Sequence, residues 1–149
     1  MPNARVLTIL SAILTVPAIL HAAPSRNVRA TLVTEAASIQ PGQPFQVGLR
    51  LEMAPEWHTY WKNPGDSGLA TRIRWTLPEG WSAGPLQWPI PQRIAAGPLM
   101  SFGYEHAVFL LTEMTPPRGV ASGTTVRIAA RADWLECKEA CLPGRADLE

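Results

Sequence analysis

The sequence predicts an all-β fold, an immunoglobulin-like antiparallel β-sandwich. Fifteen prolines and eleven glycines are spread along the 149 residues, and this frequency of turn-forming residues favours short strands over long helices. Between the turns lie six or seven short segments in which apolar and polar residues alternate, as they do in half-buried strands. Short strands at this spacing are typical of a two-sheet sandwich.

The expected strands follow in order along the chain. Residues 28–39 begin with alternation and lead to a Pro-Gly turn, and residues 45–53 place an apolar side chain at every second position. Residues 57–62 are aromatic and strand-like, residues 63–68 form a loop, and residues 72–77 alternate again before a second turn. Each of these strands would turn one face toward a shared core.

Two further strands are expected in the C-terminal half, at residues 104–112 and 125–134. Residues 85–91 are extended but flanked by proline, so we expect an edge segment at best. The six tryptophans are expected to serve the core and the sheet faces, since burial of an indole ring is a large apolar gain.

Residues 1–23 are expected to be a secretory signal peptide. A positively charged start is followed by an apolar stretch over residues 6–20, and Ala22 and Ala23 offer two alternative cleavage positions. The apolar stretch is shorter than the ~20 residues that span a bilayer. We therefore expect an exported protein whose residues 24–149 form one domain.

The composition excludes several classes of function. The net charge is +1 and the Lys and Arg residues are scattered, so the chain lacks the basic footprint of a nucleic-acid-binding protein. No segment after residue 23 is apolar for long enough to cross a membrane. Methionine and histidine do not cluster, and we expect no metal and no cofactor other than a disulfide.

The most informative feature is the pair Cys137 and Cys141, which are the only cysteines and have three residues between them. In an exported protein such a pair is a structural disulfide, a redox-active dithiol or, less in keeping with this spacing, a metal site. A bridge that closes so short a ring stabilises by only ~2 kcal/mol in the chain-entropy model. Spacing alone leaves these alternatives open.

Four charged residues surround the pair in the sequence. Lys138 and Arg145 would favour a thiolate, whereas Glu136 and Glu139 would oppose it. Because these effects partly cancel, the sequence does not predict a strongly depressed thiol pKa, which suits a relay better than a powerful oxidant.

Five motifs in a fixed order resemble one known family. They are WHTYWKNPGDSG at 57–68, LPEGW at 77–81, QWP at 87–89, FGY at 102–104 and WLECKEACLPG at 134–144. Together they resemble the periplasmic N-terminal domain of the DsbD-type thiol:disulfide interchange proteins, in particular the ScsB-like branch that is linked to copper tolerance. The resemblance covers nearly the whole chain after the signal peptide.

The resemblance implies an immunoglobulin-like sandwich with a redox-active cysteine pair. In this family a membrane electron-transfer domain, fed by a thioredoxin-like domain, reduces the pair. The pair then reduces periplasmic thioredoxin-fold partners that serve disulfide isomerisation and cytochrome c maturation. By motif match, Cys141 would be the partner-facing cysteine and Cys137 the resolving one.

The resemblance also implies residues around the pair. Residues 100–104 match the cap loop of the family, with Phe102 and Tyr104 as the aromatic residues that shield the disulfide. His58 and Tyr60 fall where the family places polar and aromatic side chains beside the cysteines. Without the resemblance, Phe102 and His58 would be interpreted as packed residues of the sandwich.

This sequence departs from the family pattern in two respects. Its cysteines are closer together than those of the DsbD domain, and the sequence stops eight residues past Cys141. We therefore expect the last strand of the sandwich to be incomplete or lacking. The membrane and thioredoxin-like domains are absent from these residues, as in a fragment or in a protein with separately encoded partners.

Two other functions are compatible with the sequence. Thiols together with Met100, Met114 or His106 are ligands that suit Cu(I), which would make a copper-binding module. A sandwich adaptor with a purely structural disulfide is the other alternative, and a very low reduction potential would favour it.

Overall fold

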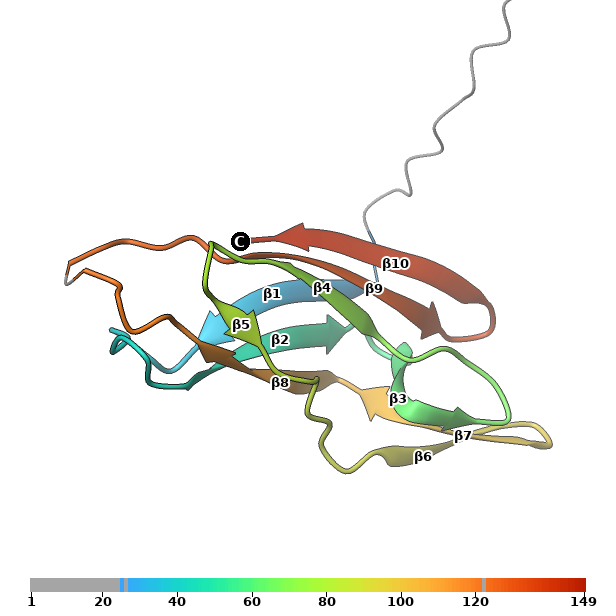
Figure 1. Cartoon of the computed structure of the whole chain (residues 1–149). Helices are drawn as coiled ribbons and strands as arrows, with labels where there is room; N and C mark the ends of the chain where they lie inside the picture. Colours follow the sequence, from blue (N-terminus) through green and yellow to red (C-terminus); the bar gives the residue numbers. More distant parts are fainter. Residues whose placement is uncertain (1–24, 26, 122) are drawn as a thin grey trace, which may run out of the picture.

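In the part that the structure describes, the chain forms ten β-strands in two antiparallel sheets (Figure 1). This computed structural model describes residues 25, 27–121 and 123–149, and no helix occurs among them. The expected signal peptide lies outside the described residues. Nothing in the described ranges forms a helix that could cross a membrane.

The smaller sheet has four strands in the order β1-β2-β8-β5. Its strands are β1 (Val28–Thr34), β2 (Phe45–Met53), β8 (Ala107–Thr115) and the short β5 (Ser82–Ala83). Strands β1 and β2 lie where alternation predicts them, because their alternate apolar side chains reach the core.

The larger sheet has six strands, five of them in the order β10-β9-β3-β7-β6, while β4 pairs with β9. Its strands are β3 (His58–Gly65), β4 (Arg72–Thr76), β6 (Gln92–Ala96), β7 (Leu99–Glu105), β9 (Ala129–Cys137) and β10 (Cys141–Leu148).

The core lies between the two sheets. Leu49, Leu51 and Leu110 of the smaller sheet are buried, and they form one cluster with Ala132 and Trp134 of the larger sheet. Since successive residues of a strand point to opposite faces, the odd-numbered residues of β9 face away from this core. The fold class predicted from the sequence is confirmed.

The segment 104–112 is not one strand, as the sequence suggested, but two that belong to different sheets. The chain changes sheets at His106, which has a left-handed backbone (φ 64°), and the amide of Met53 donates to the His106 carbonyl at 2.7 Å. A uniform alternation in the sequence hides this corner, because a single left-handed residue leaves the pattern on either side intact.

The residues after Cys141 form β10, an eight-residue strand paired with β9 along its length. The sequence predicted an incomplete or missing last strand here, and proline and glycine at positions 143 and 144 are residues that favour turns. The structure instead places both residues within β10. Gly144 lies against the Trp134 indole, where a Cβ atom would overlap the ring, so the glycine serves close packing.

Two further boundaries differ from the prediction. The last long strand expected at 125–134 begins and ends later, as β9. Residues 92–105, which the sequence did not resolve into strands before 104, form the β6–β7 hairpin. Residues 85–91 make only an isolated bridge, from Gln87 to Leu111, in keeping with their prolines.

Candidate redox site at the end of the β9–β10 hairpin

Cys137 and Cys141 are joined by a disulfide across the end of a hairpin. Cys137 is the last residue of β9 and Cys141 the first of β10, and the two oppose each other directly in the strand register. Their Cα atoms are 4.1 Å apart. The three-residue turn is closed by a hydrogen bond from the Lys138 amide to the Ala140 carbonyl. Strand pairing therefore brings the two sulfurs together on one face of the sheet.

The two cysteines differ sharply in exposure. Cys137 is 2% exposed and lies between β10 and β3, where it pairs with His58. Cys141 begins the edge strand and is exposed. A large reactant approaching from solvent therefore meets Cys141 first.

A tyrosine and a histidine lie beside Cys141. The Tyr60 hydroxyl is 3.7 Å from the Cys141 Sγ atom, and it is also 3.2 Å from His58 Nε2. The two rings meet edge to face, with their centroids 5.2 Å apart. His58 and Tyr60 are two residues apart on β3, so both point to the face that carries the disulfide. The structure thus brings together four of the six residues predicted from the sequence.

Burial favours the neutral form of both side chains. Desolvation lowers the pKa of His58, and Glu105, its neighbour on β7, opposes that effect. Desolvation also raises the pKa of Tyr60, against a hydrogen bond with Ser67. A neutral tyrosine hydroxyl can donate to a sulfur that carries negative charge, which is the form a cysteine takes during thiol–disulfide exchange.

A loop after β3 covers Tyr60, and sequence reasoning did not anticipate this role. Gly68 has a left-handed backbone (φ 103°), and a Cβ atom there would overlap the Tyr60 ring. Ala70 forms a parallel bridge with Tyr60, and the hydroxyls of Ser67 and Ser101 are 2.9 Å apart. In the sequence, Gly68 was the one sign that the loop passes close to the Tyr60 ring.

The two aromatic residues predicted to cap the disulfide are placed differently. Residues 100–104 lie within strand β7 and do not form a loop. Phe102 packs edge-on against Trp61 at 6.5 Å between centroids. The Tyr104 hydroxyl donates to the Pro89 carbonyl at 2.8 Å, and its ring belongs to the core. Strand alternation puts both rings on the core side, so their capping role stays a prediction that this geometry does not support.

The charges expected to act on the thiols are held by other partners. The Lys138 ammonium lies 2.6 Å from Glu56, and the Arg145 guanidinium lies 2.6 Å from Asp133. The polar side-chain group that contacts the Cys141 sulfur is the Tyr60 hydroxyl. The sequence indicated that neighbouring charges partly cancel here. In the structure Lys138 and Arg145 are paired instead with Glu56 and Asp133, which lie in other parts of the chain.

Glu136 is a buried carboxylate on the core side of β9, next to Cys137. It accepts hydrogen bonds from the Trp134 indole at 2.9 Å, from the Asn27 amide at 2.9 Å and from the Ser25 hydroxyl. Three donors satisfy the charge, so this residue secures the start of the domain against β9 and does not face the sulfurs.

The residues that the structure describes hold no cluster of three or more histidine, cysteine or acidic side chains suited to a metal. Of the suggested copper ligands, Met114 is fully buried in the core. His106 lies at the corner between β7 and β8.

The structure is a β-sandwich that carries a disulfide at the end of a hairpin, with one cysteine exposed and the other buried. This is the class of protein in which a rigid scaffold presents a cysteine pair to solvent. The comparison with protein families identifies the class: residues 28–149 match the family described as thiol:disulfide interchange protein DsbD, N-terminal. Since the match covers most of the chain, the protein belongs to this family, as its motifs indicated.

A solved structure supports the fold. The N-terminal periplasmic domain of ScsB from Proteus mirabilis superposes with a TM-score of 0.61 at 20% sequence identity, over 83% of this chain and 45% of that chain. This sequence therefore spans less than half the length of that solved chain. The search of curated proteins found no match.

Proposed function

We propose that this domain is an exported thiol:disulfide interchange module that passes electrons through Cys137 and Cys141 to thioredoxin-fold protein partners. The observation that carries the proposal is the asymmetry of the pair. Cys141 is exposed on an edge strand with a tyrosine hydroxyl at its sulfur, and Cys137 is buried directly beside it. A purely structural bridge has no need of this arrangement.

The exchange follows from the positions of the two sulfurs. In the reduced domain the Cys141 thiolate attacks a disulfide sulfur of the partner, and the partner's other sulfur leaves as a thiolate. The Cys137 thiolate then attacks Cys141 Sγ, which restores the intramolecular disulfide and releases the partner fully reduced. Two electrons move from the domain to the partner. Reduction of the domain by a donor dithiol is the same sequence in reverse.

Tyr60 and His58 assist the reaction of the exposed Cys141 sulfur. Tyr60 contacts the reacting sulfur, and its hydroxyl donates a hydrogen bond to the Cys141 thiolate, whether that thiolate is attacking or leaving. His58 contacts the tyrosine oxygen and acts as a positioning residue that holds the hydroxyl toward the sulfur.

The proposed location and partners follow from the family. The signal peptide expected at residues 1–23 and the periplasmic relative support a periplasmic location. A membrane electron-transfer domain of the DsbD type would reduce it. The electrons that this domain passes on would be used for disulfide isomerisation, cytochrome c maturation or copper tolerance. The chemistry requires no cofactor beyond the disulfide.

The proposal is tested by the reduction potential of the pair, measured by thiol trapping in graded glutathione or dithiothreitol buffers. We expect a midpoint between about −200 and −270 mV, where catalytic dithiols lie. A midpoint below about −300 mV would indicate a structural disulfide and contradict the proposal.

A further inference from the structure

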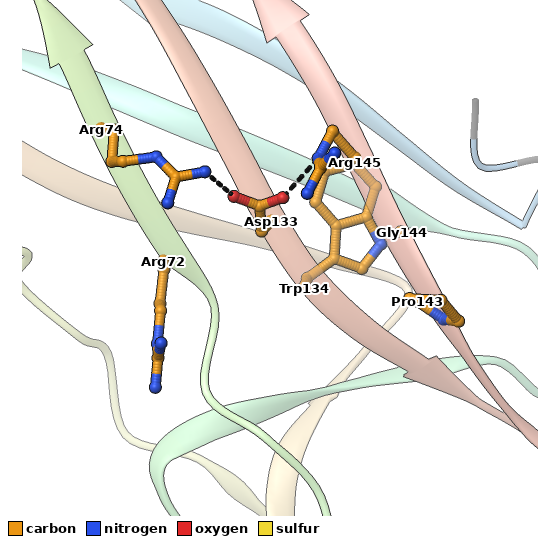
Figure 2. Close-up of a pocket in the computed structure, with 7 residues that line it drawn as sticks. All are labelled: Arg72, Arg74, Asp133, Trp134, Pro143, Gly144 and Arg145. Carbon is orange, nitrogen blue, oxygen red and sulfur yellow. Dashed lines mark hydrogen bonds and ion pairs between the residues drawn. The ribbon is translucent and has the colours of Figure 1, made fainter. Parts of the chain in front are cut away.

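The face of the sheet that carries the disulfide continues into a groove lined by arginines. Figure 2 shows this groove between β4 and β10, across β9. It has a volume of about 340 Å³. Its charged lining residues are Arg72, Arg74, Asp133 and Arg145.

The groove holds an excess of positive charge. The Asp133 carboxylate is shared by Arg74, at 2.7 Å, and by Arg145, at 2.6 Å. Three guanidinium groups and one carboxylate leave a net charge of two positive units (three minus one) among the lining residues. Arg72 opposes Asp133 in the strand register, yet in Figure 2 its side chain points away from that carboxylate. Among the described residues Arg72 makes no ion pair.

The groove begins beside the exposed sulfur. Pro143, which lines it, lies two residues along β10 from Cys141, a distance of about 7 Å in an extended strand. On the other side, a smaller hollow of about 190 Å³ shares Arg72 with the groove and is bounded by Leu69 and Ala70. Ala70 bridges to Tyr60, whose hydroxyl reaches the same sulfur.

The loop that follows β3 adds an apolar side chain, Leu69, to this surface. Leu69 is 63% exposed at the edge of the smaller hollow. Leu69 and the arginines line two adjoining hollows that meet at Arg72. A partner whose sulfur reaches Cys141 would place the residues that flank this sulfur near them. Uncompensated guanidinium groups are good partners for carboxylates, which they bind with two parallel hydrogen bonds.

We propose that this groove docks the segment of a redox partner protein that flanks its reactive cysteine, and that a carboxylate side chain of that segment pairs with Arg72. The inference rests on the proposed function and adds the chemistry of the partner: acidic residues beside the cysteine, with an apolar residue for Leu69.

The test uses three synthetic peptides as the probe. Each has one cysteine joined by a disulfide to 2-nitro-5-thiobenzoate, and they differ only in the flanking residues, which are Glu, Gln or Lys. The reduced domain attacks the peptide sulfur and releases the coloured thiolate, and Cys137 then displaces the peptide as a thiol. Rates are divided by those measured with dithiothreitol, which removes differences in intrinsic reactivity between the peptides.

The proposal predicts that the Glu peptide reacts about two- to fivefold faster than the Gln peptide, the range expected for an exposed ion pair, and that the Lys peptide reacts more slowly. The preference should fade as the salt concentration rises. In Arg72→Gln the preference for the Glu peptide should shrink, and in Arg72→Glu it should disappear, because the lining residues then keep a net charge of one positive unit and of zero, respectively. Arg29→Glu is the matched control, because Arg29 is also exposed and also opposes a carboxylate residue, Glu52, but on the other sheet.

Each other outcome is decisive. Equal normalised rates for the three peptides would overturn the docking groove while leaving the proposed function intact. An equal effect of Arg72→Glu and Arg29→Glu would also overturn it, since net charge would then explain the preference. Release from none of the peptides, with a disulfide that dithiothreitol still reduces, would contradict the proposed function and the groove with it.

Discussion

At the scale of single residues, the disulfide is less informative than the side chains that contact it. A cross-strand bridge at the end of a hairpin could serve stability alone. The hydroxyl of Tyr60 at the exposed sulfur, held by a neutral His58, suggests a sulfur whose charge changes. In the proposed exchange the buried Cys137 supplies the second sulfur, which resolves the mixed disulfide, without being open to solvent.

Replacement of Tyr60 should slow exchange without removing it. In Tyr60→Phe the Cys141 thiolate loses a hydrogen-bond donor worth about 1 kcal/mol, so exchange should slow about fivefold. The pH at which Cys141 becomes reactive should rise. The measurement is the pH–rate profile with a small aromatic disulfide. Tyr104→Phe is the control, since the Tyr104 hydroxyl donates to the Pro89 carbonyl and not to a sulfur; an equal slowing in both variants would contradict the role of Tyr60.

His58 should make the stability of the oxidised domain depend on pH. Burial lowers its pKa below 6.5, so as the pH falls through 6.5 the unfolded chain takes up a proton that the folded domain resists. The stabilisation is complete above pH 6.5 and is progressively lost below it, down to the pKa of the folded state. Urea unfolding at pH 7.5 and 5.5 measures this loss.

In His58→Gln the pH dependence should become shallower. In the control variant His106→Asn it should persist, because His106 is exposed and asparagine tolerates the left-handed backbone found there. If the free energy of unfolding depended on pH as steeply in His58→Gln as in the unchanged domain, His58 would not be the source of the pH dependence.

At the scale of elements, the site depends on the loop that follows β3. Asp66 ties this loop to β7, because its carboxylate accepts from the Met100 amide at 2.8 Å and its own amide donates to the Met100 carbonyl at 3.0 Å. The loop then passes over Tyr60 at Gly68. The position of the hydroxyl at the sulfur is therefore set by a segment far from the cysteines in sequence.

A methyl group at position 68 should disturb both stability and exchange. Gly68→Ala introduces a Cβ atom where the Tyr60 ring lies, on a left-handed backbone, which should cost about 2 kcal/mol and displace the tyrosine. Thermal unfolding and the exchange rate measure the two effects. In Gly119→Ala nothing lies within 4 Å of the new atom, so neither should change. A Gly68→Ala variant that exchanges at the normal rate would contradict the role of the loop.

The element scale also shows why the sequence predicted some strands and missed others. Strands β1, β2 and β4 could be predicted because one face of each packs on the core while the other meets solvent. The β6–β7 hairpin and β10 contain glycine and proline, which favour turns in isolation. Pairing with β9 overrides that preference at Pro143 and Gly144, and such pairing is not local information.

At the scale of the whole molecule, the sandwich displays its disulfide at a sheet edge. The outward residues of β10 include Arg145 and Asp147, both paired to side chains of β9, and such charges discourage another strand from adding to the edge. A partner is therefore expected to approach Cys141 through side chains and not by extending the sheet.

The arrangement of the whole molecule also explains which residues of the site could be predicted from the sequence. The cysteines, His58 and Tyr60 were identified through motifs that span the chain. The aromatic cap was not matched, because a strand in place of a loop turns Phe102 to the core side. Gly68 and Arg72 reach the site only through the packing of distant segments, which no local pattern records.

The measurement that tests the central claim most directly is mixed-disulfide trapping with single-cysteine variants. The probe is a periplasmic disulfide isomerase of thioredoxin fold, with its second active-site cysteine replaced and the first activated by 2-nitro-5-thiobenzoate. We predict that Cys137→Ser, which keeps Cys141, forms the covalent complex rapidly, whereas Cys141→Ser, which keeps the buried Cys137, does not. Complex formation at equal rates in the two variants, or in neither, would contradict the account.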